Sequence, residues 1–311
     1  MQIGIIEPQD FSLRALTLLN DLGNVSKFKS GKIGDFLADK EIIFVRLNYY
    51  YDTHILSKAN KLKYICTPTT GLNHLDLDYL RKKNIKVISL KGEFDFLSDI
   101  RATSEHTFGL ILSLLRNYKS AISTTKENFS RDLFKGDEIF NNSIGIIGFG
   151  RIGKLLAKYI EVFNGNCFFY DIDTTIKEIY GAKKLNSVEE LISKCNVITL
   201  CASYEETSNK FFNKAYIDLL KDKFFINTSR GELINEKYLL KKVKEKFFKG
   251  IAIDVIQDES KENNNLDEFL NIDKSINFII TPHIAGATFT SMIRTEDFVT
   301  KKLFSELNFS K

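Results

Sequence analysis

The sequence has no paired cysteines, no long hydrophobic run and no large block of one charge. Its four cysteines, Cys66, Cys167, Cys195 and Cys201, include no CxxC pair, and three of them lie in apolar, strand-like stretches. Such positions are typical of small, buried, unpaired thiols, which fit a reducing compartment. The apolar runs are far too short to span a membrane, and MQIGIIEPQD shows no secretory signal. We therefore expect a cytoplasmic protein with no membrane partner.

Charge is nearly balanced along the chain. There are 44 Lys and Arg against 40 Asp and Glu, a net charge of +4, and no basic block is interleaved with aromatic residues. We therefore expect no nucleic-acid partner. Apolar residues make up 43% and charged residues 27% of 311 residues, which is typical of a globular protein with room for two domains. No two histidines have the spacing of metal ligands, so no metal site is expected.

Short apolar runs alternate with helix-like segments in two successive sets. The first set predicts buried parallel strands at 3–6, 42–45, 63–66 and 85–89, with helices at 11–19 and 75–83. A helix at 102–118 and a polar connection at 120–142 follow. The second set predicts strands at 144–147, 167–170, 197–201, 224–227, 250–254 and 277–281, with helices at 151–163, 188–194, 213–220 and 235–247. The insert 258–273 is predicted as a loop. A final helix at 288–308 has no later strand, so we expect it to return to the first set.

The stretch IGIIGFGRIG, residues 144–153, has the GxGxxG spacing of a turn between a strand and a helix. Gly148 would permit the tight turn, Gly150 would let a pyrophosphate approach the backbone, and Gly153 would let helix and strand pack closely. The phosphates would meet free N–H groups where the helix begins. Asp171 ends the next strand, where a carboxylate binds the ribose hydroxyls of NAD and repels the 2′-phosphate of NADP. We therefore expect NAD as the cofactor.

Three polar side chains follow later strands of the second set. Arg230 follows INTS, Glu259 follows AIDVIQD, and His283 follows IITP. Ligands of open parallel sheets bind at the carboxyl ends of the strands, so we expect these side chains to share one site. An arginine there can hold a carboxylate through two hydrogen bonds. A histidine oriented by an acidic partner can exchange a proton near neutral pH.

In this order and spacing, GFGRIG, NTSRGELIN, AIDVIQDE and TPHIAGAT resemble the D-isomer-specific 2-hydroxyacid dehydrogenases, which include D-lactate, D-3-phosphoglycerate, glycerate and hydroxypyruvate enzymes. The resemblance covers nearly the whole chain. It implies an α/β fold of two Rossmann-like or flavodoxin-like domains, with an NAD-binding doubly wound parallel sheet inserted into a smaller substrate domain. The implied substrate domain is 1–101 plus 288–311, and the implied NAD-binding domain is 102–287.

The resemblance also implies a role for each matching residue. His283 would be the acid/base, Glu259 its partner, and Arg230 the clamp on the substrate's carboxylate and C2 oxygen, as a 2-ketoacid and a D-2-hydroxyacid are interconverted by hydride transfer. Asp254 matches the aspartate that binds the nicotinamide carboxamide. The implied cofactor contacts are Gly148, Gly150, Arg151, Ile152, Gly153, Asp171, Cys201, Thr207, Thr228, Ser229, Asp254 and Thr103. The implied substrate contacts are Arg46, Thr70, Gly71 and Arg230.

Several interpretations stay open at this level. Arg46 lies where phosphoglycerate-type members have an arginine near the substrate, but a surface ion pair explains it equally well. Ser260 stands where the family usually has a proline after the catalytic Glu, which predicts a looser loop around Glu259. Residues 200–212 also lack the family's proline, which predicts an altered wall beside the cofactor.

Because homodimerisation is the family habit, the resemblance also implies a homodimer, formed through the nucleotide domain and the 120–142 connection. The alternative to an enzyme is a non-catalytic NAD(H)-sensing, corepressor-like binding protein on the same fold.

Overall fold

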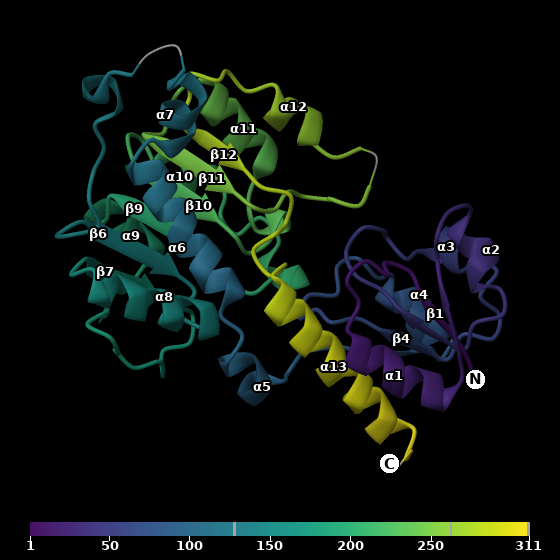
Figure 1. Ribbon diagram of the computed structural model, residues 1–311. Coiled ribbons are helices and arrows are strands. Elements are labelled where there is room, and N and C mark those ends of the chain that lie inside the picture. The colour runs from purple at the N-terminus through teal and green to yellow at the C-terminus, as the bar shows by residue number, and fades with distance from the viewer. Residues whose placement is uncertain (127–128, 262, 310–311) are drawn as a thin grey trace. The chain divides into compact units, whose positions relative to one another are not determined.

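The computed structural model describes residues 1–126, 129–261 and 263–309, and these form two compact units. Unit 1 comprises residues 1–99 and 287–309 together with 260–261. Unit 2 comprises the described residues of 100–259 and 263–286. Each unit has its own parallel sheet with helices on both faces (Figure 1). The predicted α/β fold with two doubly wound sheets is therefore confirmed.

The sheet of unit 1 has five parallel strands in the order β2-β1-β3-β4-β5. Its strands are β1 (Gln2–Ile5), β2 (Asn24–Lys27), β3 (Ile42–Phe44), β4 (Tyr64–Cys66) and β5 (Lys86–Ile88). Four of them match the predicted apolar runs. The prediction missed β2, whose sequence NVSK is polar and partly exposed because the strand pairs only with β1 at the edge of the sheet.

Helices cover both faces of the sheet of unit 1. They are α1 (Leu13–Leu22), α2 (Ile33–Leu37), α3 (Thr53–Leu56), α4 (Leu77–Lys82), α5 (Phe94–Ser98) and α13 (Phe289–Glu306). The terminal helix α13 packs against α1, β4 and β5, although nearly two hundred residues separate its start from Asp99, where the first segment of unit 1 ends. A core cluster that includes Leu37, Leu56 and Leu80 joins α2, α3 and α4 to the sheet.

A partly buried ion pair attaches α13 to the rest of unit 1. Glu296 is fully buried, and its Oε1 accepts hydrogen bonds from Arg46 Nη2 at 2.5 Å and Arg46 Nε at 3.1 Å. Its Oε2 accepts from the backbone N of Ser12 at 2.7 Å. Arg46 also donates from Nη1 to the carbonyl of Gln9 at 2.9 Å. Arg46 thus forms an ion pair, inside the unit rather than on its surface, and a substrate contact of Arg46 stays a prediction.

The sheet of unit 2 has seven parallel strands in the order β12-β11-β10-β9-β6-β7-β8. Its strands are β6 (Ser143–Ile147), β7 (Asn166–Tyr170), β8 (Lys183–Lys184), β9 (Val197–Leu200), β10 (Phe224–Asn227), β11 (Gly250–Ile253) and β12 (Phe278–Ile280). The order reverses between β6 and β9, and such a switch point is where open parallel sheets bind their ligands. The prediction missed only the two-residue edge strand β8.

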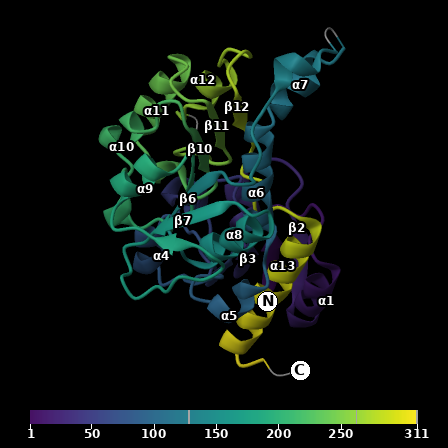
Figure 2. The ribbon, with the colours of Figure 1, turned by 90° about the vertical axis from the view of Figure 1, so that its left-hand side faces the viewer.

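The helices of unit 2 lie in two layers around this sheet (Figures 1 and 2). They are α6 (Ala102–Leu115), α7 (Tyr118–Thr124), α8 (Arg151–Val162), α9 (Val188–Lys194), α10 (Lys214–Asp218), α11 (Glu236–Lys244) and α12 (Leu266–Leu270). One core cluster joins α6 and α8 to one face, and another joins α9, α10 and α11 to the opposite face. Short 3-10 turns are η1 (Arg131–Phe134), η2 (Glu206–Ser208) and η3 (Gly231–Leu233).

Two local predictions were wrong in unit 2. The helix predicted at 102–118 ends at Leu115, and α7 starts a new direction because Asn117 has a left-handed φ of 53°. The insert 258–273 is not loop throughout, since α12 forms within it and buries Phe269 in the core. Among the described residues, no helix combines the length and apolarity needed to cross a membrane.

The Arg46–Glu296 pair gives a stability prediction. Glu296→Ala should destabilise unit 1 by about 3–5 kcal/mol, because it leaves a half-buried guanidinium and a buried N–H without their acceptor. The measurement is urea unfolding. The matched control is Glu306→Ala on the same helix, which breaks an exposed pair with Lys86 and should cost much less. Equal losses in the two variants would show that the buried pair does not stabilise the unit.

Candidate active site

The glycine-rich turn between β6 and α8 leaves no room for side chains at two of its three glycines. Gly148 has a φ of +91°, and a Cβ atom there would lie 2.6 Å from the backbone N of Ala202. A Cβ atom on Gly153 would lie 2.5 Å from the carbonyl oxygen of Gly148. By contrast, a Cβ atom on Gly150 would meet nothing within 4 Å. The turn is therefore tightly packed on its protein side and open at Gly150.

The start of α8 is suited to an anion. Gly150 is its N-cap, so no side chain caps the helix, whereas Ser187 caps α9 and Asn235 caps α11. The first N–H groups of the helix, in Arg151 and Ile152, thus lie beside the open space at Gly150. The guanidinium of Arg151 donates to the carbonyl of Ile100 at 2.7 Å.

Asp171 lies beside the same turn. Its Oδ2 accepts a hydrogen bond from the backbone N of Phe149 at 2.6 Å, and its Oδ1 accepts from the backbone N of Asp173 at 2.9 Å. A carboxylate can accept about four hydrogen bonds, so both oxygens keep capacity for hydroxyl donors. An open glycine, an uncapped helix start and a neighbouring carboxylate fit the pyrophosphate and ribose of NAD.

The other predicted cofactor residues fall into different settings. Cys201 follows β9, and its carbonyl carbon would lie 2.8 Å from a Cβ on Gly148, so it borders the glycine turn at the switch point. Thr228 is buried and its hydroxyl lies 2.7 Å from that of Thr107 on α6. Ser229 donates from Oγ to the carbonyl of Leu200 at 2.7 Å. Thr207 is exposed in η2, and Thr103 is half-buried on α6.

His283 and Glu259 are in direct contact. Nδ1 of His283 lies 2.6 Å from Oε2 of Glu259, while Oε1 of Glu259 accepts from the backbone N of Ile256 at 3.1 Å. His283 has a left-handed φ of 52°, and its backbone N donates to the carbonyl of Asp254 at 2.8 Å. A carboxylate accepts hydrogen bonds, so Nδ1 of His283 is the donor in this contact and Nε2 is the ring nitrogen that faces away from Glu259.

Asp254 holds the turn that carries His283. Its Oδ1 accepts from Thr281 Oγ1 at 2.6 Å and from the backbone N of Ile284 at 2.9 Å, and its Oδ2 accepts from the backbone N of Ala285 at 2.9 Å. Burial alone raises the pKa of Asp254, but hydrogen bonds from His106, Thr281 and the two backbone N–H groups outweigh it and lower the pKa. The buried carboxylate is therefore ionised at neutral pH.

Arg230 belongs to the same electrostatic cluster. Its Nη1 donates to the carbonyl of Ser229 at 2.6 Å. Burial lowers the pKa of Arg230, and the nearby charges of Glu259, Glu232 and Asp254 oppose this by favouring the guanidinium. The structure thus brings Arg230, Glu259, Asp254 and His283 together at the carboxyl ends of β10, β11 and β12.

Two further polar residues, one part-buried and one buried, lie next to this cluster. His106 on α6 has its Nε2 3.3 Å from Thr281 Oγ1 and 3.4 Å from Asp254 Oδ1. Glu236 at the start of α11 accepts a hydrogen bond from the backbone N of Gln257 at 2.6 Å. No sequence motif marks either contact, since both depend on how distant segments pack.

Two of the substrate contacts predicted in unit 1, Thr70 and Gly71, lie on an ordered turn. Thr69 Oγ1 donates to the carbonyl of Gly71 at 2.8 Å, and Thr67 Oγ1 lies 3.0 Å from Thr69 Oγ1 and 3.2 Å from His74 Nε2. The side chain of Thr70 is exposed on this turn. The hydrogen bonds therefore fix the backbone around Thr70 and Gly71 and leave the turn accessible.

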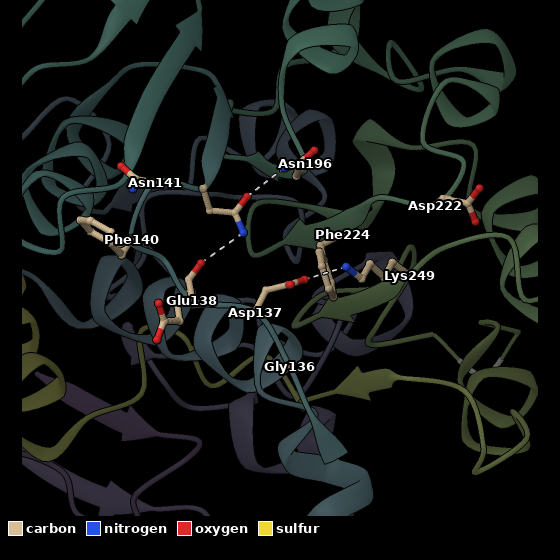
Figure 3. A pocket seen from close by; sticks show the side chains of 10 residues that line it. Gly136, Asp137, Glu138, Phe140, Asn141, Asn196, Asp222, Phe224 and Lys249 are labelled. Atoms are coloured by element: carbon tan, nitrogen blue, oxygen red, sulfur yellow. Dashed lines mark hydrogen bonds and ion pairs between the residues drawn. The ribbon is translucent and has the colours of Figure 1, made fainter. Parts of the chain in front are cut away.

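A polar hollow of about 610 Å³ lies at the opposite, amino-terminal edge of the sheet of unit 2 (Figure 3). Lys249 pairs there with Asp137 at 2.6 Å, and Asn196 donates to Asn142 at 3.1 Å. The residues that line it include none of the predicted site residues. Because ligands of parallel sheets bind at the carboxyl ends of the strands, we do not assign the cofactor to this hollow.

Comparison with known proteins gives a consistent result. The family model of the D-isomer specific 2-hydroxyacid dehydrogenase, NAD binding domain, matches residues 108–285. A protein of Staphylococcus saprophyticus, named as a 2-hydroxyacid dehydrogenase, is 30% identical over 278 residues, which cover 88% of this chain and 84% of that protein. The D-3-phosphoglycerate dehydrogenase of Methanocaldococcus jannaschii is 28% identical over 281 residues, covering 88% of this chain and 52% of that protein.

A solved structure agrees with these matches. The D-lactate dehydrogenase of Aquifex aeolicus, complexed with NAD and lactic acid, superposes with a TM-score of 0.83 at 28% identity, over 99% of this chain and 96% of that one. The resemblance predicted from the four motifs is confirmed, as is the NAD cofactor. The chain belongs to the D-isomer specific 2-hydroxyacid dehydrogenase family and is an NAD-dependent 2-hydroxyacid dehydrogenase.

Proposed function

We propose that this protein interconverts a 2-ketoacid and a D-2-hydroxyacid with His283 as the acid/base, Glu259 as its partner and Arg230 as the substrate clamp. The observation that carries the proposal is the 2.6 Å contact between His283 Nδ1 and Glu259 Oε2, with Arg230 in the same charge cluster. The residues proposed to hold NAD are those of the glycine turn, Asp171 and the residues that follow β9 and β10.

The proposed chemistry follows from these positions. When bound, NADH supplies a hydride to C2 of the ketoacid, and NAD⁺ takes it back in the reverse direction. Glu259 accepts a hydrogen bond from Nδ1–H of His283 and orients the ring, and protonated His283 donates its Nε2 proton to the C2 oxygen. Arg230 binds the carboxylate and stabilises the negative charge that develops on that oxygen. The net change is ketoacid plus NADH plus H⁺ to hydroxyacid plus NAD⁺.

The contacts of Arg46 favour a substrate that has no phosphate group. A phosphate contact at Arg46 would have to compete with the buried carboxylate of Glu296 and the carbonyl of Gln9, which already occupy the guanidinium. We therefore propose that the 2-ketoacid and 2-hydroxyacid are small and carry no phosphate. In this they would resemble the lactic acid of the Aquifex aeolicus structure rather than the substrate of the phosphoglycerate enzyme.

The assay that tests this function measures NADH absorbance with pyruvate, hydroxypyruvate, 2-ketoglutarate and 3-phosphohydroxypyruvate. We expect turnover with an unphosphorylated ketoacid, and a loss of about 10²–10⁴-fold in kcat in His283→Ala with NADH affinity retained. His54→Ala, an exposed histidine on α3, serves as the matched control. Preference for 3-phosphohydroxypyruvate would contradict the substrate class. Tight NADH binding without turnover on a broad panel would favour the NAD(H)-sensing alternative.

Asp171 is the proposed reader of the adenosine ribose. Asp171→Ala should weaken NADH binding about tenfold or more, because hydrogen bonds to charged groups contribute about 1.5–3 kcal/mol, and should relax the discrimination against NADPH. Fluorescence titration with both cofactors measures this. Asp173→Ala is the control, since Asp173 is an exposed carboxylate two residues away. If only the Asp173 variant changed the preference, Asp171 would not be the reader.

We also propose a homodimer formed through unit 2. The described residues of 118–140 expose several large apolar side chains: Tyr118, Ile122, Phe129, Leu133 and Phe140. An apolar surface of this kind is typical of a protein interface. Light scattering should give about twice the 35.7 kDa chain mass, and Ile122→Asp should halve it. Leu13→Asp, on an equally exposed apolar residue of α1, should leave the mass unchanged. A monomeric wild-type chain would contradict this proposal.

A further inference from the structure

The described residues of the loop that carries Glu259, 254–261 and 263–265, form no helix or strand. The loop leaves β11 after Ile253 and reaches α12 at Leu266, and Ser260 follows Glu259, so no proline ring restricts the backbone there. Within the loop, Asn264 Nδ2 donates to the carbonyl of Glu259 at 3.2 Å. The backbone N of Ile256 also donates to Glu259 Oε1 at 3.1 Å. Both bonds are made within the loop, so a side chain that must lie 2.6 Å from an imidazole also needs support from outside it.

That support comes from Glu236, outside the loop. Glu236 is the first residue of α11 and only 4% exposed. Its Oε2 accepts a hydrogen bond from the backbone N of Gln257 at 2.6 Å, and its Oε1 accepts from Asn265 Nδ2 at 2.6 Å. Gln257 precedes Glu259 by two residues, whereas Asn265 follows it by six. One buried carboxylate therefore ties the two ends of the loop together.

The same segment also packs against the loop directly. Gly231 is buried, and a Cβ atom on it would lie 2.0 Å from the carbonyl carbon of Ile256 and 2.1 Å from the backbone N of Gln257. The peptide between Ile256 and Gln257 thus contacts Gly231 on its face, and its N–H binds Glu236. The segment 230–236 therefore contains Arg230, the proposed substrate clamp, and also Gly231 and Glu236, which contact the loop that carries Glu259.

We propose that Glu236 is a positioning residue that holds Glu259, and through it His283, in the reactive arrangement. This inference rests on the proposed function of the Glu259–His283 pair. Glu236 has no contact with substrate or cofactor in this proposal and acts only through the loop. A carboxylate is suited to the position because it accepts hydrogen bonds at both oxygens and donates none.

The test compares four variants of the full-length protein: Glu236→Leu, Glu259→Gln, the double variant, and Glu245→Leu as the matched control. Glu245 is an exposed residue just past the other end of α11. Glu236→Leu removes both acceptors while keeping the side chain similar in size. We expect it to lower kcat about 10–100-fold, because a displacement of about 1 Å costs about 10²-fold. NADH affinity and the control should stay within about twofold of wild type.

Two further readouts distinguish positioning from general destabilisation. The pH profile of kcat/KM in Glu236→Leu should shift in the same direction as in Glu259→Gln, because both changes weaken the partner of His283. The double variant should be no slower than Glu259→Gln alone, since a residue that acts through Glu259 has no effect once Glu259 is replaced. Glu236→Gln should recover most of the lost kcat, because Asn265 can turn its amide to bind the new one.

The outcomes separate this inference from the function it rests on. If Glu259→Gln keeps full turnover, the proposed pair and this inference both fail. If Glu259→Gln is slow but Glu236→Leu has wild-type kcat, or if the two losses multiply in the double variant, only this inference fails. Should Glu236→Leu not fold, Asn265→Ala can be measured instead, because it removes one hydrogen bond to Glu236 and keeps the one from Gln257. This variant should lose less kcat than Glu236→Leu would, with a pH profile shifted in the same direction. Wild-type behaviour of that variant would overturn the inference.

Discussion

The buried carboxylate of Asp254 is the interaction on which the site depends. Its two oxygens hold Thr281, Ile284 and Ala285, while its backbone N donates to Asn227 at 2.9 Å. Its side chain and backbone thus join the ends of β10, β11 and β12 at one point. An ionised group without these partners would cost several kcal/mol in such surroundings, so the turn after β12 has one low-energy arrangement. That arrangement includes the left-handed backbone of His283.

Parallel sheets explain why a few strand ends suffice to bring Arg230, Glu259 and His283 into one charge cluster. Adjacent parallel strands run in register, so the residues that follow them emerge at the same edge. The loops after β10 and β11 must also pack against each other. They do so where Gly231, which has no side chain, contacts the peptide that follows Ile256. The charge cluster of Arg230 and Glu259 follows from this fit.

Much of this fold could be predicted from the sequence, because buried strands such as VITL and GIAI have no exposed face and appear as unbroken apolar runs. The edge strands β2 and β8 escaped prediction because an edge position tolerates polar residues such as NVSK and KK. The motif spacing also predicted His283, Glu259 and Arg230 as neighbours. It could not predict the contacts of Glu236, which accepts hydrogen bonds from residues 21 and 29 positions away.

The attachment of α13 has a consequence for how the chain reaches its native state. Val299 and Leu303 are fully buried on this helix. Glu296, which pairs with Arg46, follows it by 250 positions in the sequence. During synthesis the first sheet therefore emerges with one face only partly covered, and all of unit 2 is made before the missing helix. Contacts this distant in sequence form slowly, and uncovered apolar surface invites aggregation. The early strands of unit 1 thus keep apolar surface uncovered until the helix that ends at Glu306 has been synthesised.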